Sequence, residues 1–121
     1  MAAPDRFHGL LIVDKPAGWT SHDVVGRIRR ICGQRSVGHA GTLDPAATGI
    51  LPVALGSALR ALEYLASATK SYRAEITFGL TTDALDADGR LTARCEPPEL
   101  NTAQMRALLD GFVGPSEQIP P

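Results

Sequence analysis

Hydrophobic and polar positions predict alternating strands and helices in the first half of the chain. The apolar run Gly9–Val13 precedes the turn-rich DKPAGWTS, which favours a buried strand. Apolar residues then recur at spacings of three and four, which indicates a helix that Ser21 caps and Gly33 ends. The apolar stripe of this helix consists of Val24, Val25, Ile28, Ile31 and Cys32.

Residues 34–49 show neither the alternation of a strand nor the three- and four-residue spacing of a helix. They are rich in glycine and small side chains, which predicts a loop. The run Ile50–Leu55 predicts a strand, in which Pro52 favours an edge or a start over the middle of a ladder. Ser57 is a candidate cap for a helix that extends to about Ala66. Its buried face would consist of Leu59, Leu62 and Leu65.

Strict alternation over Ser71–Phe78 predicts a strand, with Tyr72 on its apolar face. The following GLTTDALDADGRL is polar and contains an Asp-Gly turn signal, so it predicts a loop that leads into a short strand at about Arg90–Arg94. Beyond two prolines, Asn101 or Thr102 would cap a helix. Its stripe of Met105, Leu108, Leu109 and Phe112 is interpreted as core packing.

Composition is that of a soluble globular protein with one domain at most: 121 residues, 44% hydrophobic and 21% charged. No segment resembles a signal peptide or a membrane span, so we expect a cytoplasmic protein. Cys32 and Cys95 form no C-x-x-C pair and are expected to be reduced and half-buried. The three histidines lack metal-ligand spacing, so we expect no metal site. The chain ends at QIPP without a closing element, which suggests a part of a larger protein.

Charge is distributed unevenly along the chain although the net charge is only −1. Residues 1–73 carry nine basic and five acidic side chains, whereas residues 74–121 carry three and eight. A polyanion could therefore approach the first part. On charge alone, the arginines at positions 27, 29, 30 and 35 are better explained as a solvated helix face.

One carboxylate, Asp44, lies in the glycine-rich stretch GHAGTLDPAATG. Backbone N–H groups of such a loop can converge on an anion and hold it ionised. A carboxylate of this kind can act as a nucleophile at an electron-poor sugar carbon. The alternative is a turn aspartate whose side chain bonds its own backbone. From the spacing alone this alternative is favoured, because short motifs often match by chance. The glycine spacing is not that of a P-loop.

Four motifs occur in an order that resembles the N-terminal part of the bacterial TruB family of tRNA pseudouridine synthases. They are GLLIVDKPAGWTSHDVV, GHAGTLDPAATGILPVALG, KSYRAEITFGLTTDALDADG and GFVGPSEQIPP. The resemblance implies an α+β fold, a mixed and mainly antiparallel sheet with flanking helices, which is incomplete in this chain. Residues 1–121 would then be the N-terminal portion of the catalytic domain, without its remainder or the C-terminal RNA-binding domain.

The resemblance also implies roles for individual residues. Asp44 would be the nucleophile that attacks uridine 55 in the T loop of tRNA, and Tyr72 the aromatic residue that stacks on the uracil ring. His39 would pack against the T loop, and Asp86 would lie near the active site. Lys15 and Pro16 would support the catalytic loop. Gly41, Thr42 and Leu43 match the same motif beside the nucleophile and are candidate RNA-binding residues.

Elementary chemistry is compatible with these roles. The uridine must leave its stack before a nucleophile can reach it, and an aromatic ring is expected to receive the base. Without the resemblance, packing of Tyr72 with Ile76 and Phe78 would be preferred. His39 could equally bond a nearby carbonyl, and Asp86 has a strong alternative as a turn residue. The isomerisation is redox-neutral, so no cofactor is implied.

Three functions remain open at this point. The first is a stand-alone isomerase, expected to be a monomer that acts on the T stem-loop of tRNA without metal or membrane. The second is a tRNA-binding module that acts as a folding chaperone. The third is a guide-RNA-dependent relative, which shares the GHxGTLDP loop.

The basic early segment predicts salt-sensitive RNA binding. Each phosphate that a basic side chain neutralises releases counterions, so the affinity for tRNA should fall steeply between about 50 and 200 mM salt. Filter binding across a salt titration measures this. An affinity that stays flat would contradict the prediction.

Overall fold

The computed structural model describes residues 5–119. These residues form two compact units, and the boundary lies between Ser71 and Tyr72. The prediction of a single domain stays a prediction, because compact units of the backbone are not by themselves separate domains. All residues of the buried hydrophobic cluster come from the first unit. Among the described residues of the second unit, no side chain is buried.

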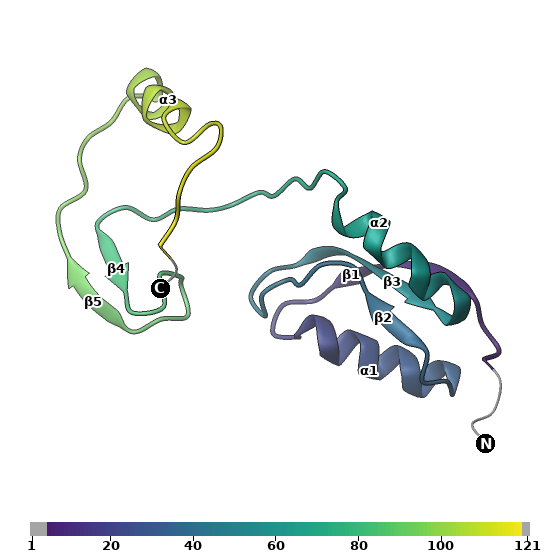
Figure 1. Cartoon of the computed structure of the whole chain (residues 1–121). Coiled ribbons are helices and arrows are strands. Elements are labelled where there is room, and N and C mark those ends of the chain that lie inside the picture. The colour runs from purple at the N-terminus through teal and green to yellow at the C-terminus, as the bar shows by residue number, and fades with distance from the viewer. Residues whose placement is uncertain (1–4, 120–121) are drawn as a thin grey trace. The chain divides into compact units, whose positions relative to one another are not determined.

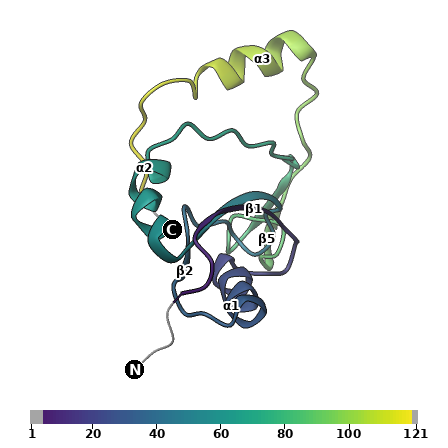
Figure 2. The same ribbon diagram turned by 90° about the vertical axis from the view of Figure 1, so that its right-hand side faces the viewer.

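The first unit is a three-stranded antiparallel sheet with helices (Figures 1 and 2). Its elements are β1 (Gly9–Lys15), α1 (Ser21–Cys32), β2 (Val37–His39), β3 (Gly49–Leu55), the 3-10 helix η1 (Gly56–Ala61) and α2 (Leu62–Ala66). The strand order is β1-β3-β2. The α+β prediction, with antiparallel pairing and flanking helices, is confirmed.

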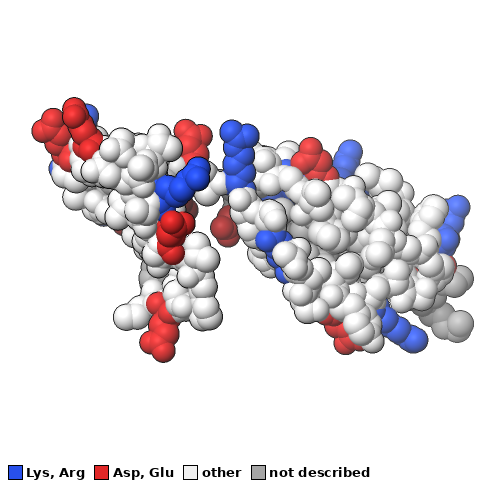
Figure 3. Space-filling model, turned by 90° about the horizontal axis from the view of Figure 1, so that it is seen from above, with Lys and Arg blue, Asp and Glu red and all other residues white. Residues whose placement is uncertain are grey.

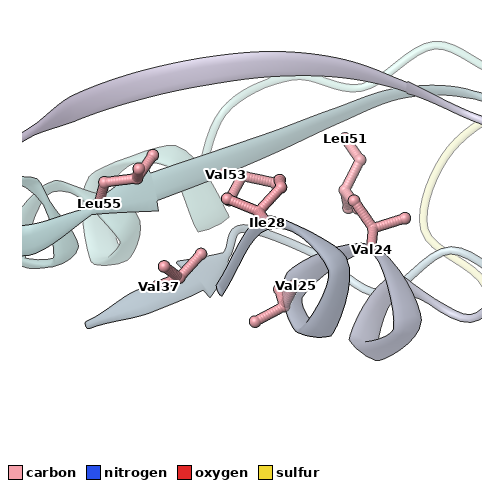
Figure 4. Packing of buried hydrophobic residues seen from close by; sticks show 7 residues of the cluster. All are labelled: Val24, Val25, Ile28, Val37, Leu51, Val53 and Leu55. Carbon is pink, nitrogen blue, oxygen red and sulfur yellow. The ribbon is translucent and has the colours of Figure 1, made fainter. Parts of the chain in front are cut away.

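The core of this unit lies between α1 and one face of the sheet. Figure 4 shows the side chains of α1 directed at those of β2 and β3. Burying an aliphatic side chain of this size stabilises a fold by about 1.5–3 kcal/mol, so this cluster is the main source of stability. It comprises Val24, Val25, Ile28, Val37, Leu51, Val53 and Leu55.

The N-cap of helix α1 lies one residue earlier than the sequence predicts. Thr20, rather than Ser21, is the N-cap: its side chain accepts a hydrogen bond from the Asp23 amide, and the Asp23 carboxylate accepts one from the Thr20 amide. This reciprocal pair satisfies two backbone donors at the start of the helix. Gly33 ends α1 in the left-handed conformation, with φ of 64°, as predicted.

The prediction that Pro52 favours an edge or a start is wrong, because β3 is the central strand. The Pro52 carbonyl accepts a hydrogen bond from the amide of Ala40 at 2.9 Å, just beyond the end of β2. Since the N and C=O of one strand residue face the same side, the proline nitrogen faces away from β1. A proline is therefore tolerated here without the loss of a bond to β1.

Two further predictions for this unit need correction. The loop predicted over residues 34–49 contains β2, whose three residues form a strand only because they pair with β3. The helical segment after β3 is found, but it starts as η1, and Ser57 makes no capping bond. The Ser57 amide instead donates to Nδ1 of His8. The three leucines of its predicted face are half-buried.

The second unit consists of a two-stranded hairpin and one helix (Figure 1). Strand β4 (Leu80–Thr82) lies in the predicted loop, while β5 (Leu91–Arg94) confirms the predicted short strand. Helix α3 (Thr102–Asp110) is also confirmed, with Asn101 as its N-cap. Its apolar stripe is not packed as predicted: Phe112 is 82% exposed.

The prediction of a strand over Ser71–Phe78 is wrong. Residues 71–77 have no strand pairing, and Tyr72 is 70% exposed. Alternation defines two faces, but a strand needs a neighbouring backbone to satisfy its N–H and C=O groups, and no described segment supplies one. The prediction that Cys95 is half-buried is wrong, because Cys95 is exposed directly after β5, whose four residues are also exposed. Both cysteines are free, and Cys32 is half-buried as predicted.

The capping pair predicts a pH dependence of stability. Hydrogen bonds from Thr20 lower the pKa of Asp23 below its ordinary value of 3.8. Ionised Asp23 therefore stabilises the fold above pH 3.8, and this contribution is lost as the pH falls through the folded-state pKa. Asp23→Asn should be less stable than the wild type at neutral pH, with the difference shrinking in acid.

Urea unfolding, followed by the fluorescence of Trp19, measures the effect, because this single tryptophan lies in the first unit. Asp14→Asn is the matched control, since the exposed carboxylate of Asp14 accepts no hydrogen bond within residues 5–119. A stability difference for Asp23→Asn that stays constant down to pH 2 would contradict the assignment.

Candidate active site

Asp44 lies on the loop between β2 and β3, with its side chain exposed. The amide of Ala47 donates to the Asp44 carbonyl at 3.0 Å, which closes a turn with Pro45 at its second position. Within the described part of the chain, the carboxylate itself accepts no hydrogen bond. The predicted cluster of N–H groups is thus not observed, and neither is the alternative side-chain turn.

Lys15 fixes the residue that follows Asp44. Its side chain is fully buried, and its ammonium donates to the carbonyls of Pro16 at 3.0 Å, Trp19 at 2.6 Å and Pro45 at 3.2 Å. All three ammonium hydrogens thereby have an acceptor, which a buried charge requires. The Gly18 amide also donates to the Pro45 carbonyl, at 2.7 Å.

Ser21 fixes the residue that precedes Asp44. The Leu43 amide donates to the Ser21 hydroxyl at 2.9 Å, and the hydroxyl lies 3.4 Å from the Leu43 carbonyl, to which it donates. The Leu43 side chain is half-buried against the core cluster. Both neighbours of Asp44 are therefore held by residues at the end of β1 and the start of α1. Sequence reasoning missed Ser21, because its hydroxyl was attributed to the helix cap.

The first half of the loop is shaped by His39 and Gly41. Nδ1 of His39 lies 2.8 Å from the Gly41 carbonyl, which can only accept, so this bond places a hydrogen on Nδ1. Gly41 has φ of +88°, which L side chains rarely adopt. The stem of Lys70 passes beside it, with Cε 3.6 Å from the position of a Cβ. Thr42 is exposed.

The first unit thus brings together His39, the loop 41–44, Lys15 and Pro16. Tyr72 and Asp86 belong to the second unit, and their place at the site stays a prediction. Asp86 has the geometry of a turn residue: one carboxylate oxygen accepts from the amides of Asp88 at 3.0 Å and Gly89 at 2.9 Å.

Other candidate sites are not supported. Among residues 5–119, no group of three or more His, Cys, Asp or Glu side chains is placed to hold a metal ion. A shallow hollow of about 380 Å³ is lined by residues 6–11, Cys32 and Leu55, none of which belongs to the predicted site. No described helix is both long and apolar enough to cross a membrane.

Charge on the surface follows the division into units. On the face seen in Figure 3, basic side chains predominate on the unit that carries β1–β3, and acidic side chains on the unit that carries α3. The carboxylate of Asp44 therefore belongs to the unit that is better suited to a polyanion.

Comparison with known proteins bears directly on the Asp44 loop. The family described as "TruB family pseudouridylate synthase (N terminal domain)" matches residues 29–121, which include the whole loop. The chain belongs to this family. Its resemblance to the TruB family, first seen in four motifs, is thereby confirmed.

Individual members of the TruB family are similar in sequence to nearly the whole of this chain. The tRNA pseudouridine synthase B of Syntrophotalea carbinolica is 51% identical over 94% of this chain and 37% of that protein. The protein of the same name from Prochlorococcus marinus is 53% identical over 93% of this chain and 35% of its own length. This chain therefore spans little more than a third of these relatives.

One solved structure is also similar. A chain in "Structure of H/ACA RNP bound to a substrate RNA containing 2'-deoxyuridine" is 46% identical in sequence, with a TM-score of 0.46, over 50% of this chain and 19% of that chain.

The buried ammonium of Lys15 predicts a large effect on stability. Lys15→Met keeps most of the stem but leaves three carbonyls without their donor, so it should destabilise the first unit by about 1–3 kcal/mol. Urea unfolding, followed by Trp19 fluorescence, measures the change. The matched control is Lys70→Met, because Lys70 donates to two carbonyls but is exposed. Equal effects of the two substitutions would contradict the importance of burial.

Proposed function

We propose that this chain is part of an isomerase that converts uridine 55 in the T loop of tRNA to pseudouridine, with Asp44 as the nucleophile. The observation that carries this proposal is an exposed carboxylate with no hydrogen-bond partner, on a loop held at both neighbouring residues, in a chain of the TruB family. The names of its relatives support tRNA as the substrate.

The free carboxylate suits a nucleophile. Hydrogen bonds that stabilise a carboxylate also make its oxygens less reactive, and Asp44 accepts none within the described residues. In the proposed reaction, an oxygen of Asp44 bonds to the ribose carbon C1′ of the uridine as the bond from C1′ to N1 of the base breaks. The detached base rotates, and its C5 bonds to C1′ and displaces the Asp44 oxygen. The C5 hydrogen is then lost to water and N1 takes up a proton, so that no oxidant or reductant is needed. The uridine must first leave its stack in the T loop. Small side chains on the Asp44 loop leave room for such a large substrate.

The neighbouring residues would serve the RNA. We propose that His39 packs against the T loop where the base has left its stack, and that Tyr72 stacks on the uracil ring. His39 is half-buried, and the bond from Nδ1 to the Gly41 carbonyl fixes the orientation of its ring. Gly41 and Thr42 lie on the exposed side of the loop, and Leu43 anchors it to the core.

Asp86 and the supporting residues complete the proposal. One oxygen of Asp86 is occupied by two amides, which leaves the other free for a basic group near the active site. Lys15 and Pro16 would support the loop, because the Lys15 ammonium bonds the carbonyls of both Pro16 and Pro45. The proposed enzyme acts as a monomer in the cytoplasm and needs no cofactor.

Substitution of Asp44 tests the proposal. Unmodified tRNA with tritium at uridine carbon 5 is incubated with this chain, and with a chimera in which the chain replaces the 37% of the Syntrophotalea carbinolica protein that it matches. Isomerisation releases tritium to water. Asp44→Asn should lower the release by about 10³-fold or more, because the amide keeps the shape but removes the nucleophile.

Control experiments separate the other two functions. Asp14→Asn should release tritium at the wild-type rate, and Asp44→Asn should still bind tRNA. Binding without release in any variant, the wild type included, would favour the chaperone module. Release that requires an added guide RNA would favour the guide-dependent relative. Undiminished release by Asp44→Asn would remove this residue from the mechanism.

A further inference from the structure

We infer that Ser21 is a positioning residue for Asp44, a role that rests on the proposed function. Ser21 is the first residue of α1 and is only 2% exposed. Its hydroxyl accepts the Leu43 amide at 2.9 Å and lies 3.4 Å from the Leu43 carbonyl. That carbonyl belongs to the peptide group that leads into Asp44.

The hydroxyl of Ser21 is not needed by the helix on which it lies. Thr20 caps α1 through the Asp23 amide, and Asp23 returns a bond to the Thr20 amide. Two adjacent hydroxyls at one helix start therefore have separate partners. Thr20 satisfies the helix, and Ser21 is free to bond the loop.

The helix gives the Ser21 hydroxyl a fixed position. Val24 and Val25, in the next turn of α1, are buried in the core cluster at 4% and 2% exposure. A hydroxyl on such an element is held more precisely than one on a loop. The bond from the Leu43 amide to Ser21 therefore holds the backbone beside Asp44 in a fixed position relative to the core.

Ser21 and Lys15 act on opposite sides of Asp44. Lys15 bonds the carbonyl of Pro45, and Ser21 bonds the backbone of Leu43. Removal of the Ser21 hydroxyl leaves the Pro45 side fixed and removes the hydrogen bonds to the Leu43 backbone, so that only the side chain of Leu43 still holds that side to the core. The expected result is a folded protein whose carboxylate is displaced, and a displacement of about 1 Å can lower a rate by about 10²-fold.

The experiment compares Ser21→Ala with Thr20→Ala, its neighbour in sequence. Thr20→Ala removes the helix cap but no bond to the loop, so it controls for a general loss of stability. Amide hydrogen exchange of the 121-residue chain reports on the loop without requiring activity. In Ser21→Ala, exchange at the Leu43 amide should accelerate by about tenfold or more. In Thr20→Ala, the acceleration should be confined to the first turn of α1.

Kinetics test the consequence for Asp44. In the form that releases tritium from tRNA, Ser21→Ala should lower kcat by about 10–10²-fold with KM for tRNA unchanged, and Thr20→Ala should leave kcat unchanged. Ser21→Thr retains the hydroxyl, so it should restore both the protection of Leu43 and kcat.

Several outcomes would overturn the inference. One is a Leu43 amide that exchanges equally fast in Ser21→Ala and the wild type. Another is a normal kcat in Ser21→Ala despite lost protection. A third is an equal loss of kcat in Thr20→Ala, which would indicate a purely structural effect. Failure of the proposed function is distinguishable, because Leu43 would then lose protection while Asp44→Asn still released tritium.

Discussion

The buried ammonium of Lys15 is the constraint on which the rest of the site depends. A charge without water is costly unless every hydrogen finds an acceptor, and no described carboxylate pairs with it. Its three acceptors are the carbonyls of Pro16, Trp19 and Pro45, from two loops that are far apart in sequence. Neither loop can therefore adopt its conformation without the other. The Asp44 loop is irregular in backbone but fixed in place.

The hydrogen bonds around Asp44 hold the backbone on both sides of it and leave its carboxylate without a partner among the described residues. Leu43 and Pro45 are bonded on either side, and the Asp44 carbonyl closes a turn with Ala47. A fixed backbone with a free functional group is the arrangement expected of a preorganised site, because little conformational entropy is lost when a substrate binds.

The two units owe their order to different physical sources. The first has a hydrophobic core between α1 and the sheet. In the second, the hairpin is held by short-range bonds: Asp83 accepts the Arg90 amide at 2.8 Å, and Asp86 accepts two amides of its own turn. The ion pair of Asp83 and Arg90, at 3.7 Å and exposed, adds little. Local hydrogen bonds maintain local structure but build no core.

The sequence by itself determined the features that depend on local chemistry. The helix at 21–32, its glycine end, the capped helix after Asn101 and the irregular loop around Asp44 all follow from spacing, capping and turn residues. Tertiary structure decided the features that depend on a partner. Pairing turned residues 37–39 into a strand and made β3 central, and the absence of a described partner left residues 71–77 without a strand. The donors that hold the Asp44 loop, above all Ser21, were likewise decided by distant contacts, because a hydroxyl beside a helix start has the same local pattern whether it caps the helix or bonds a loop.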